Sequence, residues 1–205
     1  PLGAALAAGR EHPAYRAYVE AFHADSSGTH SGAWAITEPQ VGADMVTEER
    51  PFRATARPAP DGGWILDGWK SRWIGNGYLA DMVVCMIALE GAEEEGTGVF
   101  LVPMDWPGVL RGEPVRKTGL RALNQAAIGF EDCHVPPDFL IYPPAAYRKV
   151  LTRGFLAPGN LSIGFVALGI AQAAYELGLE YAGVRHQGGR PIAGHQLVAK
   201  RLFDA

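Results

Sequence analysis

Two tryptophans and a threonine are the side chains best suited to holding a flat ligand. Trp34 and Ile36 lie in one segment with a β-strand pattern, and Thr37 follows directly. Trp73 lies in a second segment with the same pattern. Indole and aliphatic side chains can wall a site for a planar ring, while the Thr37 hydroxyl and the backbone near Ile36 can bond its polar edge. The alternative is that both tryptophans are core residues of a β-domain, the commoner role of tryptophan on a strand.

Other reactive residue types give weaker signals. Glu38 is a possible general base, but in the turn Thr37-Glu38-Pro39 a carboxylate more often bonds backbone groups or caps the loop. The six histidines show no i, i+4 or Cys-paired spacing, so we expect no metal site. The sequence also contains no phosphate-binding loop and no Gly-x-Ser-x-Gly motif.

Composition places the chain among ordinary globular proteins. Hydrophobic residues make up 48% of the 205 residues and charged residues 20%, and the net charge of -4 disfavours nucleic-acid binding. Cys85 and Cys133 are too few and too separated for a disulfide framework, so we expect a cytoplasmic location. The apolar stretch Leu161–Tyr175 is shorter than the ~20 residues of a membrane span, and we interpret it as a buried helix.

The hydrophobic pattern changes twice along the chain, from helical to β-like and back to helical. Apolar residues at helical spacing predict a short helix from His12 to Phe22. From Gly32 to about Val135, short β-branched and aromatic runs alternate with turns, and the clearest strands are Trp64–Lys70, Met82–Ile87 and Val99–Val102. No helical segment of ten or more residues interrupts this region, which disfavours a Rossmann fold.

Helical spacing returns after Pro136. A long helix carries Leu161, Phe165 and Leu168 on one face, breaks at Gly188–Pro191, and is followed by another from Ile192. We therefore predict an α+β fold, in which a closed or partly open antiparallel, barrel-like β-domain is flanked by helices and followed by the start of a helical bundle. The expected limits are 1–30 for an N-terminal helical remnant, 31–140 for the β-domain and 141–205 for the start of the bundle.

Four ordered segments resemble the acyl-CoA dehydrogenase family. The first, Ala33–Asp44, contains Thr-Glu-Pro-x-x-Gly, and the second, Gly68–Gly77, contains Trp-Ile-x-Asn-Gly. The third, Lys117–Pro136, contains Phe-Glu-Asp-x-x-Val-Pro, and the fourth, Tyr181–Gln196, contains an arginine and a glutamine between two helices. The chain departs from the family pattern at three positions, with Ala43 in place of serine, Gly75 in place of threonine and Gly188 in place of phenylalanine.

The resemblance implies an FAD site. It places Trp34, Ile36, Thr37, Trp73 and Gly75 beside the flavin ring. It also implies that three residues of the fourth segment reach the adenosine diphosphate portion of FAD across a subunit interface: Arg185, Gln187 and Gln196. In the first segment, the resemblance implies that Gly42 and Ala43 contact the thioester of the substrate.

The resemblance further implies a reaction and partners. The expected activity is FAD-dependent α,β-dehydrogenation of an acyl-CoA or acyl-carrier thioester in fatty acid metabolism. The electrons would pass to an electron-transfer flavoprotein, and the enzyme would be a homo-oligomer, a dimer or tetramer. Near Gly159-Asn160, where some members carry the base, no acid is present, so we expect the catalytic base outside these residues. Two alternatives stay open: an oxidase or monooxygenase favoured by Gly75, and a non-catalytic binding or assembly subunit.

Overall fold

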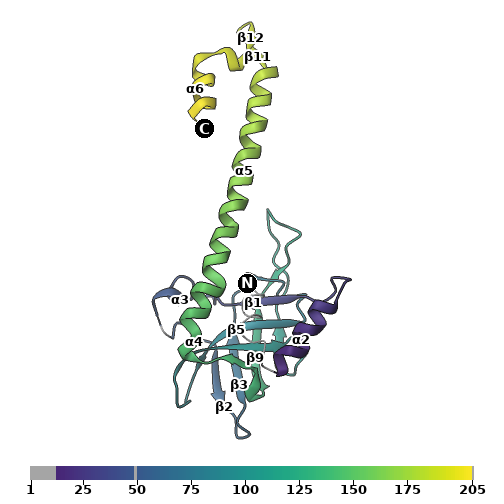
Figure 1. The fold of residues 1–205 in the computed structure, drawn as a ribbon, viewed down its shortest axis with the longest axis vertical. Coiled ribbons are helices and arrows are strands. Elements are labelled where there is room, and N and C mark those ends of the chain that lie inside the picture. Colours follow the sequence, from purple (N-terminus) through teal and green to yellow (C-terminus); the bar gives the residue numbers. More distant parts are fainter. Residues whose placement is uncertain (1–12, 49, 205) are drawn as a thin grey trace. The chain divides into compact units, whose positions relative to one another are not determined.

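The chain forms two compact units. A computed structural model describes residues 13–48 and 50–204, and it separates Pro1–Phe155 from Leu156–Ala205. The first unit contains the sheets and short helices, and the second contains one long helix, a small hairpin and a short helix (Figure 1).

The first unit is built on an eight-stranded sheet. Its strands are β1 (Gly32–Ala35), β2 (Thr55–Pro58), β3 (Trp64–Trp69), β5 (Met82–Leu89), β6 (Gly96–Pro103), β7 (Val109–Arg111), β9 (Ile128–Val135) and β10 (Leu140–Tyr142). The order is β10-β6-β5-β2-β3-β9-β7, and β1 pairs with β5 beside this path. A separate ribbon joins β4 (Ile74–Gly75) to β8 (Gln125–Ala126) in antiparallel register.

The α+β class and the three clearest predicted strands are confirmed by this sheet. Most neighbouring strands are antiparallel, but β5 pairs in parallel with both β1 and β2. The sheet is therefore mixed and not purely antiparallel as predicted, and over the described residues it forms no closed barrel, because β10 and β7 stand at the two ends of an open path. The parallel pairs could not be predicted from hydrophobic pattern, because they join segments far apart in the sequence.

Strands β5 and β6 form the centre of the core. Every residue of β5 is buried, and β6 is buried from Thr97 onward, as their unbroken apolar sequence predicted. Phe100 of β6 packs its ring edge-on against Trp64, with 5.8 Å between ring centroids. This rigid centre supports β1, the strand that leads into the candidate site.

The two cysteines lie inside this core and should be chemically inert in the folded protein. Burial raises the pKa of Cys85 to about 12 and that of Cys133 to about 11, so both remain protonated thiols at neutral pH. We expect neither to react with iodoacetamide until the protein is unfolded. Mass spectrometry of native and urea-treated samples checks this, and native labelling at either site would contradict it.

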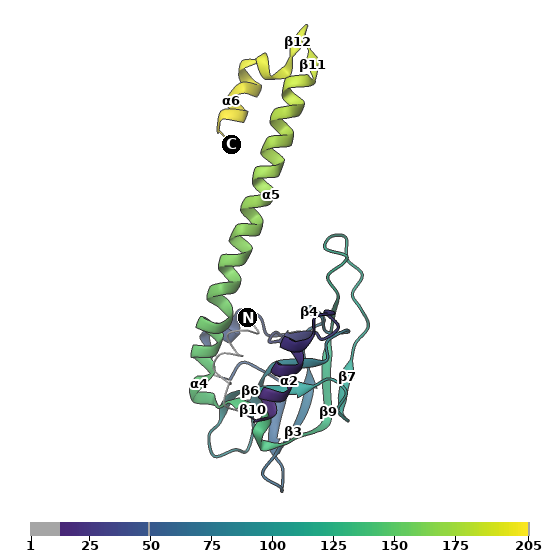
Figure 2. The same ribbon diagram turned by 45° about the vertical axis from the view of Figure 1, so that its right-hand side comes forward.

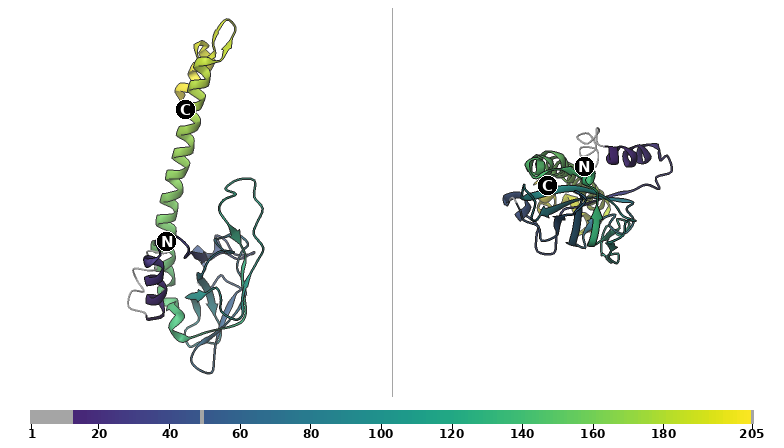
Figure 3. Two further views of the ribbon diagram at one scale, coloured as in Figure 1. Left: turned by 90° about the vertical axis from the view of Figure 1, so that its right-hand side faces the viewer. Right: turned by 90° about the horizontal axis from the view of Figure 1, so that it is seen from below.

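Short helices flank the sheet. They are α2 (Pro13–Ala24), α3 (Asp44–Thr47), the 3-10 turn η1 (Pro137–Phe139), α4 (Pro144–Lys149) and the π-helix η2 (Val150–Leu156). Figure 3 shows α2 beside the sheet, where it contacts η1. The predicted N-terminal helix is confirmed over the described part, while His12 lies outside the described residues.

A long loop connects β7 to β8. Residues 112–124 extend away from the sheet before the chain returns through β8 (Figure 2). Lys117 closes the base of the loop by donating to Leu123 O at 2.6 Å and to Gln125 Oε1 at 2.9 Å. This closure fixes β8, and through it the neighbouring strand β4.

The second unit begins with a long helix. It contains α5 (Ala157–Val184), β11 (His186–Gln187), β12 (Arg190–Pro191), the 3-10 turn η3 (Ile192–Gly194) and α6 (Gln196–Asp204). The predicted helix, break and second helix are confirmed. The break is a two-residue hairpin turn, in which Gly188 and Gly189 have φ values of 60° and 81°. Positive φ at both central positions is typical of the tight turns that join antiparallel strands.

The prediction that α5 is buried is wrong for the described structure. Residues 161–181 are all exposed, including the predicted apolar face with Leu161, Phe165 and Leu168. The helical run Pro144–Val184 is also long and apolar enough to cross a membrane by length and composition alone. A helix that is apolar on all sides needs cover from protein or lipid, and the described residues supply none along residues 161–181.

Candidate functional site

The end of β1 and strand β4 lie side by side and enclose a cleft. Ser71 N donates to Thr37 O at 2.8 Å, and Asn76 Nδ2 donates to Gly32 O at 3.2 Å, so the two segments are joined at both ends. The cleft has a volume of ≈ 360 Å³ and is lined by Trp34, Ile36, Thr37, Met45, Trp73, Ile74, Gly75 and Phe155. All five residues expected beside a flat ring therefore surround one space.

Aromatic side chains form the walls of this cleft. Trp34 stacks on Phe155 of η2, with 5.2 Å between ring centroids and 24° between ring planes. Trp73 is 54% exposed, which leaves much of its indole available for a ligand. The indole Nε1 of Trp34 is buried and finds no hydrogen-bond partner among the described residues. A buried donor without an acceptor is costly, and a ligand oxygen or nitrogen could satisfy it.

Gly75 leaves one part of the cleft open. A Cβ atom built at this position meets no other atom within 4 Å, so the site has room for a larger residue. Gly77 differs, because a Cβ there would lie 2.3 Å from Ala126 O. Glycine is thus required where the β4 turn meets β8, but it is optional at position 75.

A fully buried ion pair lies behind the cleft. Lys70 Nζ is 2.7 Å from Glu38 Oε1, and the two side chains are 0% and 1% exposed. Nζ also donates to Ile36 O at 3.3 Å and to Met86 O. Burial lowers the pKa of Lys70, and the Glu38 carboxylate beside it opposes that shift.

The Glu38 carboxylate is occupied by structural contacts. Besides Lys70, it accepts from Arg53 N at 2.7 Å and from Ala54 N at 3.2 Å. The Glu38 backbone also exchanges hydrogen bonds with Val41 across the turn. Of the two interpretations given by the sequence, the structure supports the one in which Glu38 holds the loop.

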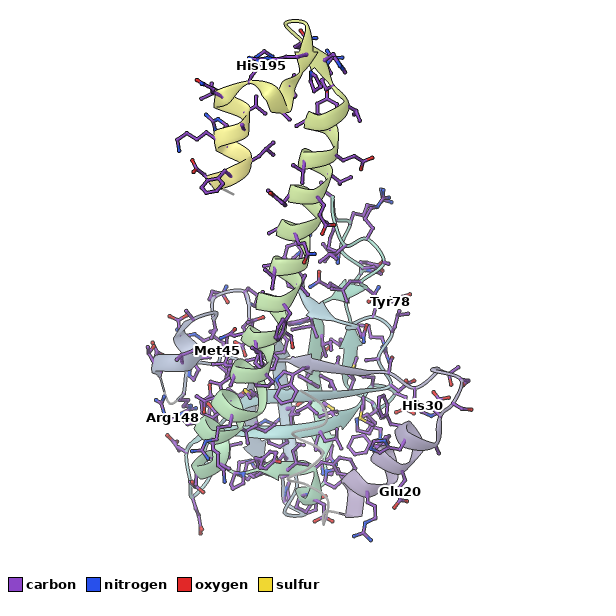
Figure 4. All side chains as sticks on the ribbon, turned by 45° about the horizontal axis from the view of Figure 1, so that its top comes forward. Glu20, His30, Met45, Tyr78, Arg148 and His195 are labelled. Carbon is purple, nitrogen blue, oxygen red and sulfur yellow. The ribbon has the colours of Figure 1, made fainter. Side chains whose placement is uncertain are left out.

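A chain of contacts connects the ion pair to Met45, another residue of the cleft lining. The Lys70 ammonium lies 4.1 Å from the ring centroid of Phe52, and Phe52 packs edge-on against Tyr147. The Tyr147 hydroxyl donates to Met45 O at 2.9 Å. Figure 4 shows Met45 close to Arg148, whose guanidinium donates to the next two carbonyl oxygens of α3. The short helix α3, which carries Met45, is therefore held by Tyr147 and Arg148 of α4.

The two expected substrate residues lie directly before α3, outside the cleft lining. Gly42 and Ala43 are exposed, and Gly42 N donates to Asp44 Oδ2 at 3.3 Å. A Cβ at Gly42 would meet nothing within 4 Å, so the described structure gives no steric reason for glycine there. Their proposed contact with substrate stays a prediction.

The other three expected cofactor residues lie in the second unit. Arg185 caps α5, Gln187 belongs to β11, Gln196 begins α6, and all three side chains are exposed. His195 organises this hairpin, because its Nε2 lies 2.9 Å from Gln187 O (Figure 4). The three residues are thus brought near one another on one small motif.

Sequence reasoning missed Met45, Ile74 and Phe155 in the cleft, and it missed the position of Lys70 behind it. Ile74 stands between two predicted residues and could have been included on adjacency. Phe155 carries no such signal, since it is 121 positions beyond Trp34 and comes from a π-helix. Segments with π-helical geometry are frequent at functional sites, but they are not readable from sequence.

Comparison with known proteins identifies the family. The family model described as acyl-CoA dehydrogenase, middle domain, matches residues 33–133, and that described as acyl-CoA dehydrogenase, C-terminal domain, matches residues 149–205. The chain belongs to the acyl-CoA dehydrogenase family. The resemblance carried by the four sequence segments is therefore confirmed.

Individual relatives agree with this assignment. The chain is 34% identical over 180 residues to the short-chain specific acyl-CoA dehydrogenase, mitochondrial, of Rattus norvegicus, covering 87% of this chain and 42% of that protein. A probable acyl-CoA dehydrogenase from Mycobacterium abscessus superposes with a TM-score of 0.82 at 26% identity, covering 98% of this chain and 50% of that one.

A third relative was solved with the cofactor. The acyl-CoA dehydrogenase of Bacillus anthracis complexed with FAD superposes with a TM-score of 0.70 at 28% identity, covering 84% of this chain and 29% of that one. The chain spans less than half the length of the rat protein and half or less of these two solved chains.

Proposed function

We propose that the full-length protein is an FAD-dependent acyl-CoA dehydrogenase. The observation that carries this proposal is the cleft between the end of β1 and β4, where Trp34, Thr37, Trp73 and Gly75, from the two segments that resemble the family's flavin motifs, come together. The substrate would be an acyl-CoA or acyl-carrier thioester, and the electrons would pass to an electron-transfer flavoprotein. The active enzyme would be a dimer or tetramer located in the cytoplasm.

The residues of the cleft fit a flavin. The ring system of FAD needs flat apolar walls, which Trp34, Phe155 and Trp73 offer, and polar partners at its edge. The unpaired Nε1 of Trp34 and the hydroxyl of Thr37 are donors in the wall or lining of the same space. We propose that Arg185, Gln187 and Gln196 bind the diphosphate portion, as their planar or amide donors suit it.

The bound flavin would accept the hydride that leaves the substrate β-carbon. Removing the α-proton needs a carboxylate near the substrate. None of the described residues that line the cleft is a carboxylate, and Glu38 is buried against Lys70. The chain's own part would be to bind and orient the ring and to exclude water from it, while the base would come from elsewhere in the protein.

Anaerobic titration tests the proposed function. When acyl-CoA thioesters of different chain length are added to the purified full-length protein, the flavin absorbance near 450 nm should bleach. Protein that contains flavin but shows no bleaching with any thioester would indicate a binding or assembly subunit. Protein that retains no flavin would overturn the proposal.

The open space at Gly75 favours a second candidate, a flavin oxidase or monooxygenase. A ring edge with no side chain over it is more accessible to oxygen. The two candidates are separated by mixing substrate-reduced protein with aerated buffer, because a dehydrogenase reoxidises slowly and an oxidase rapidly.

A substitution at Gly75 sharpens this distinction. Since a Cβ there contacts nothing within 4 Å, Gly75→Thr should fold normally and restore the family's usual hydroxyl. We expect its reduced flavin to reoxidise at least several-fold more slowly than the wild type, as measured by stopped-flow absorbance. An unchanged rate would show that Gly75 does not control oxygen access.

A further inference from the structure

We propose that Lys70 is a positioning residue of the cofactor cleft, which fixes and polarises the peptide group between Ile36 and Thr37 so that its N–H can donate to the polar edge of the bound ring. The inference rests on the proposed flavin site and assigns a role to a residue outside the cleft lining. Three observations carry it: where the ammonium lies, which atoms it binds, and how little stability such a pair is expected to contribute.

The ammonium lies at the point where β1 separates from β5. The last paired residues of these strands are Ala35 and Cys85. Lys70 Nζ binds the carbonyl oxygens of the next residue on each strand, Ile36 and Met86. The ammonium thus replaces the hydrogen bonds that a further pair of strand residues would make. It holds the β1 backbone at the point where this backbone leaves the sheet toward the cleft.

The bond to Ile36 O acts on the atoms that face a ligand. Ile36 C=O and Thr37 N–H belong to one trans peptide group, in which the two bonds point in opposite directions. Because Nζ lies on the carbonyl side, the N–H is directed away from the buried ammonium. A cation at the oxygen draws electron density from the amide and makes its N–H a stronger donor.

The backbone next to Lys70 fixes the other half of the same wall. Ser71 N donates to Thr37 O at 2.8 Å, and Lys70 N donates to Ile128 O at 2.8 Å. Residues Ile36 and Thr37 are therefore held by Lys70 through its side chain and by Ser71 through its main chain. Both peptide oxygens of this short segment are therefore occupied, and the proposal assigns the Thr37 N–H to the ligand.

Stability alone is a poor reason for this arrangement. Two charges that are 0% and 1% exposed are costly to remove from water, and a neutral pair of similar volume is often no less stable. A charged pair in this place is therefore better explained by the precise direction it gives to Ile36 O and to the Glu38 turn.

The test uses the neutral double variant Lys70→Met/Glu38→Gln in the full-length protein. It removes both charges together, so the apoprotein should keep a thermal midpoint close to the wild type. We expect its FAD to bind roughly tenfold more weakly, as one charge-assisted contact is lost, and we expect the absorption maxima and midpoint potential of the bound flavin to shift. Wild-type affinity, spectrum and potential in a folded double variant would overturn the proposal.

A second measurement needs no variant and applies even if the double variant does not fold. In protein labelled with ¹⁵N-threonine, the Thr37 amide resonance should move downfield when FAD is added to the apoprotein. An unmoved resonance would overturn the role of Lys70 while leaving the flavin site intact. If the wild-type protein binds no FAD, both the proposed function and this inference fail.

Discussion

Replacing Glu38 by leucine is expected to lower the free energy of unfolding by about 3–5 kcal/mol, because the substitution leaves a buried ammonium without its counter-charge. Lys70 is fully buried and cannot turn toward water to regain solvation. The change also removes the acceptor of Arg53 N and Ala54 N. Urea unfolding of the apoprotein, followed by tryptophan fluorescence, measures the loss.

The matched control is the double variant Lys70→Met/Glu38→Gln, in which the glutamine amide oxygen can still accept from one of the two backbone N–H groups. Since no charge remains in the core, we expect it to recover most of the stability lost in Glu38→Leu. Equal stability of Glu38→Leu and the wild type would contradict the prediction. It would mean that water or another group reaches Lys70 in solution.

Local pattern predicted the elements of this fold well. The unbroken apolar runs of β5 and β6 identified strands covered on both faces, and the glycine pair Gly188-Gly189 identified the break after the long helix. These features depend on residues close together in sequence. Each is decided by the side chains of the element itself, which is why the sequence contains them.

Non-local features were not predictable in the same way. The parallel pairing of β1 with β5 joins Trp34 to Val84, and it requires the whole sheet order to be known. The stacking of Phe155 on Trp34 depends on a π-helix at the end of the first unit. The exposure of α5 was mispredicted because an apolar sequence shows that a surface needs cover but does not show where the cover comes from.

The candidate site shows the same division between local and non-local information. The motif around Trp34 and Thr37 and the motif around Trp73 and Gly75 were each recognisable, and the resemblance implied that they share a ligand. Their common cleft depends on Ser71 N bonding Thr37 O and on Asn76 bonding Gly32 O, contacts between segments more than thirty residues apart. Lys70 lies within the second segment, Gly68–Gly77, but the sequence did not indicate that its side chain holds the first.

Truncating Trp73 to alanine is expected to weaken FAD binding by roughly ten- to a hundredfold, because the indole is the exposed aromatic wall of the cleft. Trp73 is 54% exposed, so it contributes little to the core and its removal should change the unfolding midpoint only slightly. Isothermal titration of the full-length apoprotein with FAD measures the affinity. The loss should appear in the dissociation constant while the urea midpoint stays near that of the wild type.

Trp69 provides a matched control in the same protein. It is 45% exposed, close to the exposure of Trp73, but it packs over Gly129 and does not line the cleft. Trp69→Ala removes the same side chain from a similarly exposed position, so it should leave FAD affinity unchanged within about twofold. If both variants lose affinity equally, the effect comes from the β-domain as a whole; if neither does, the flavin does not rest against Trp73.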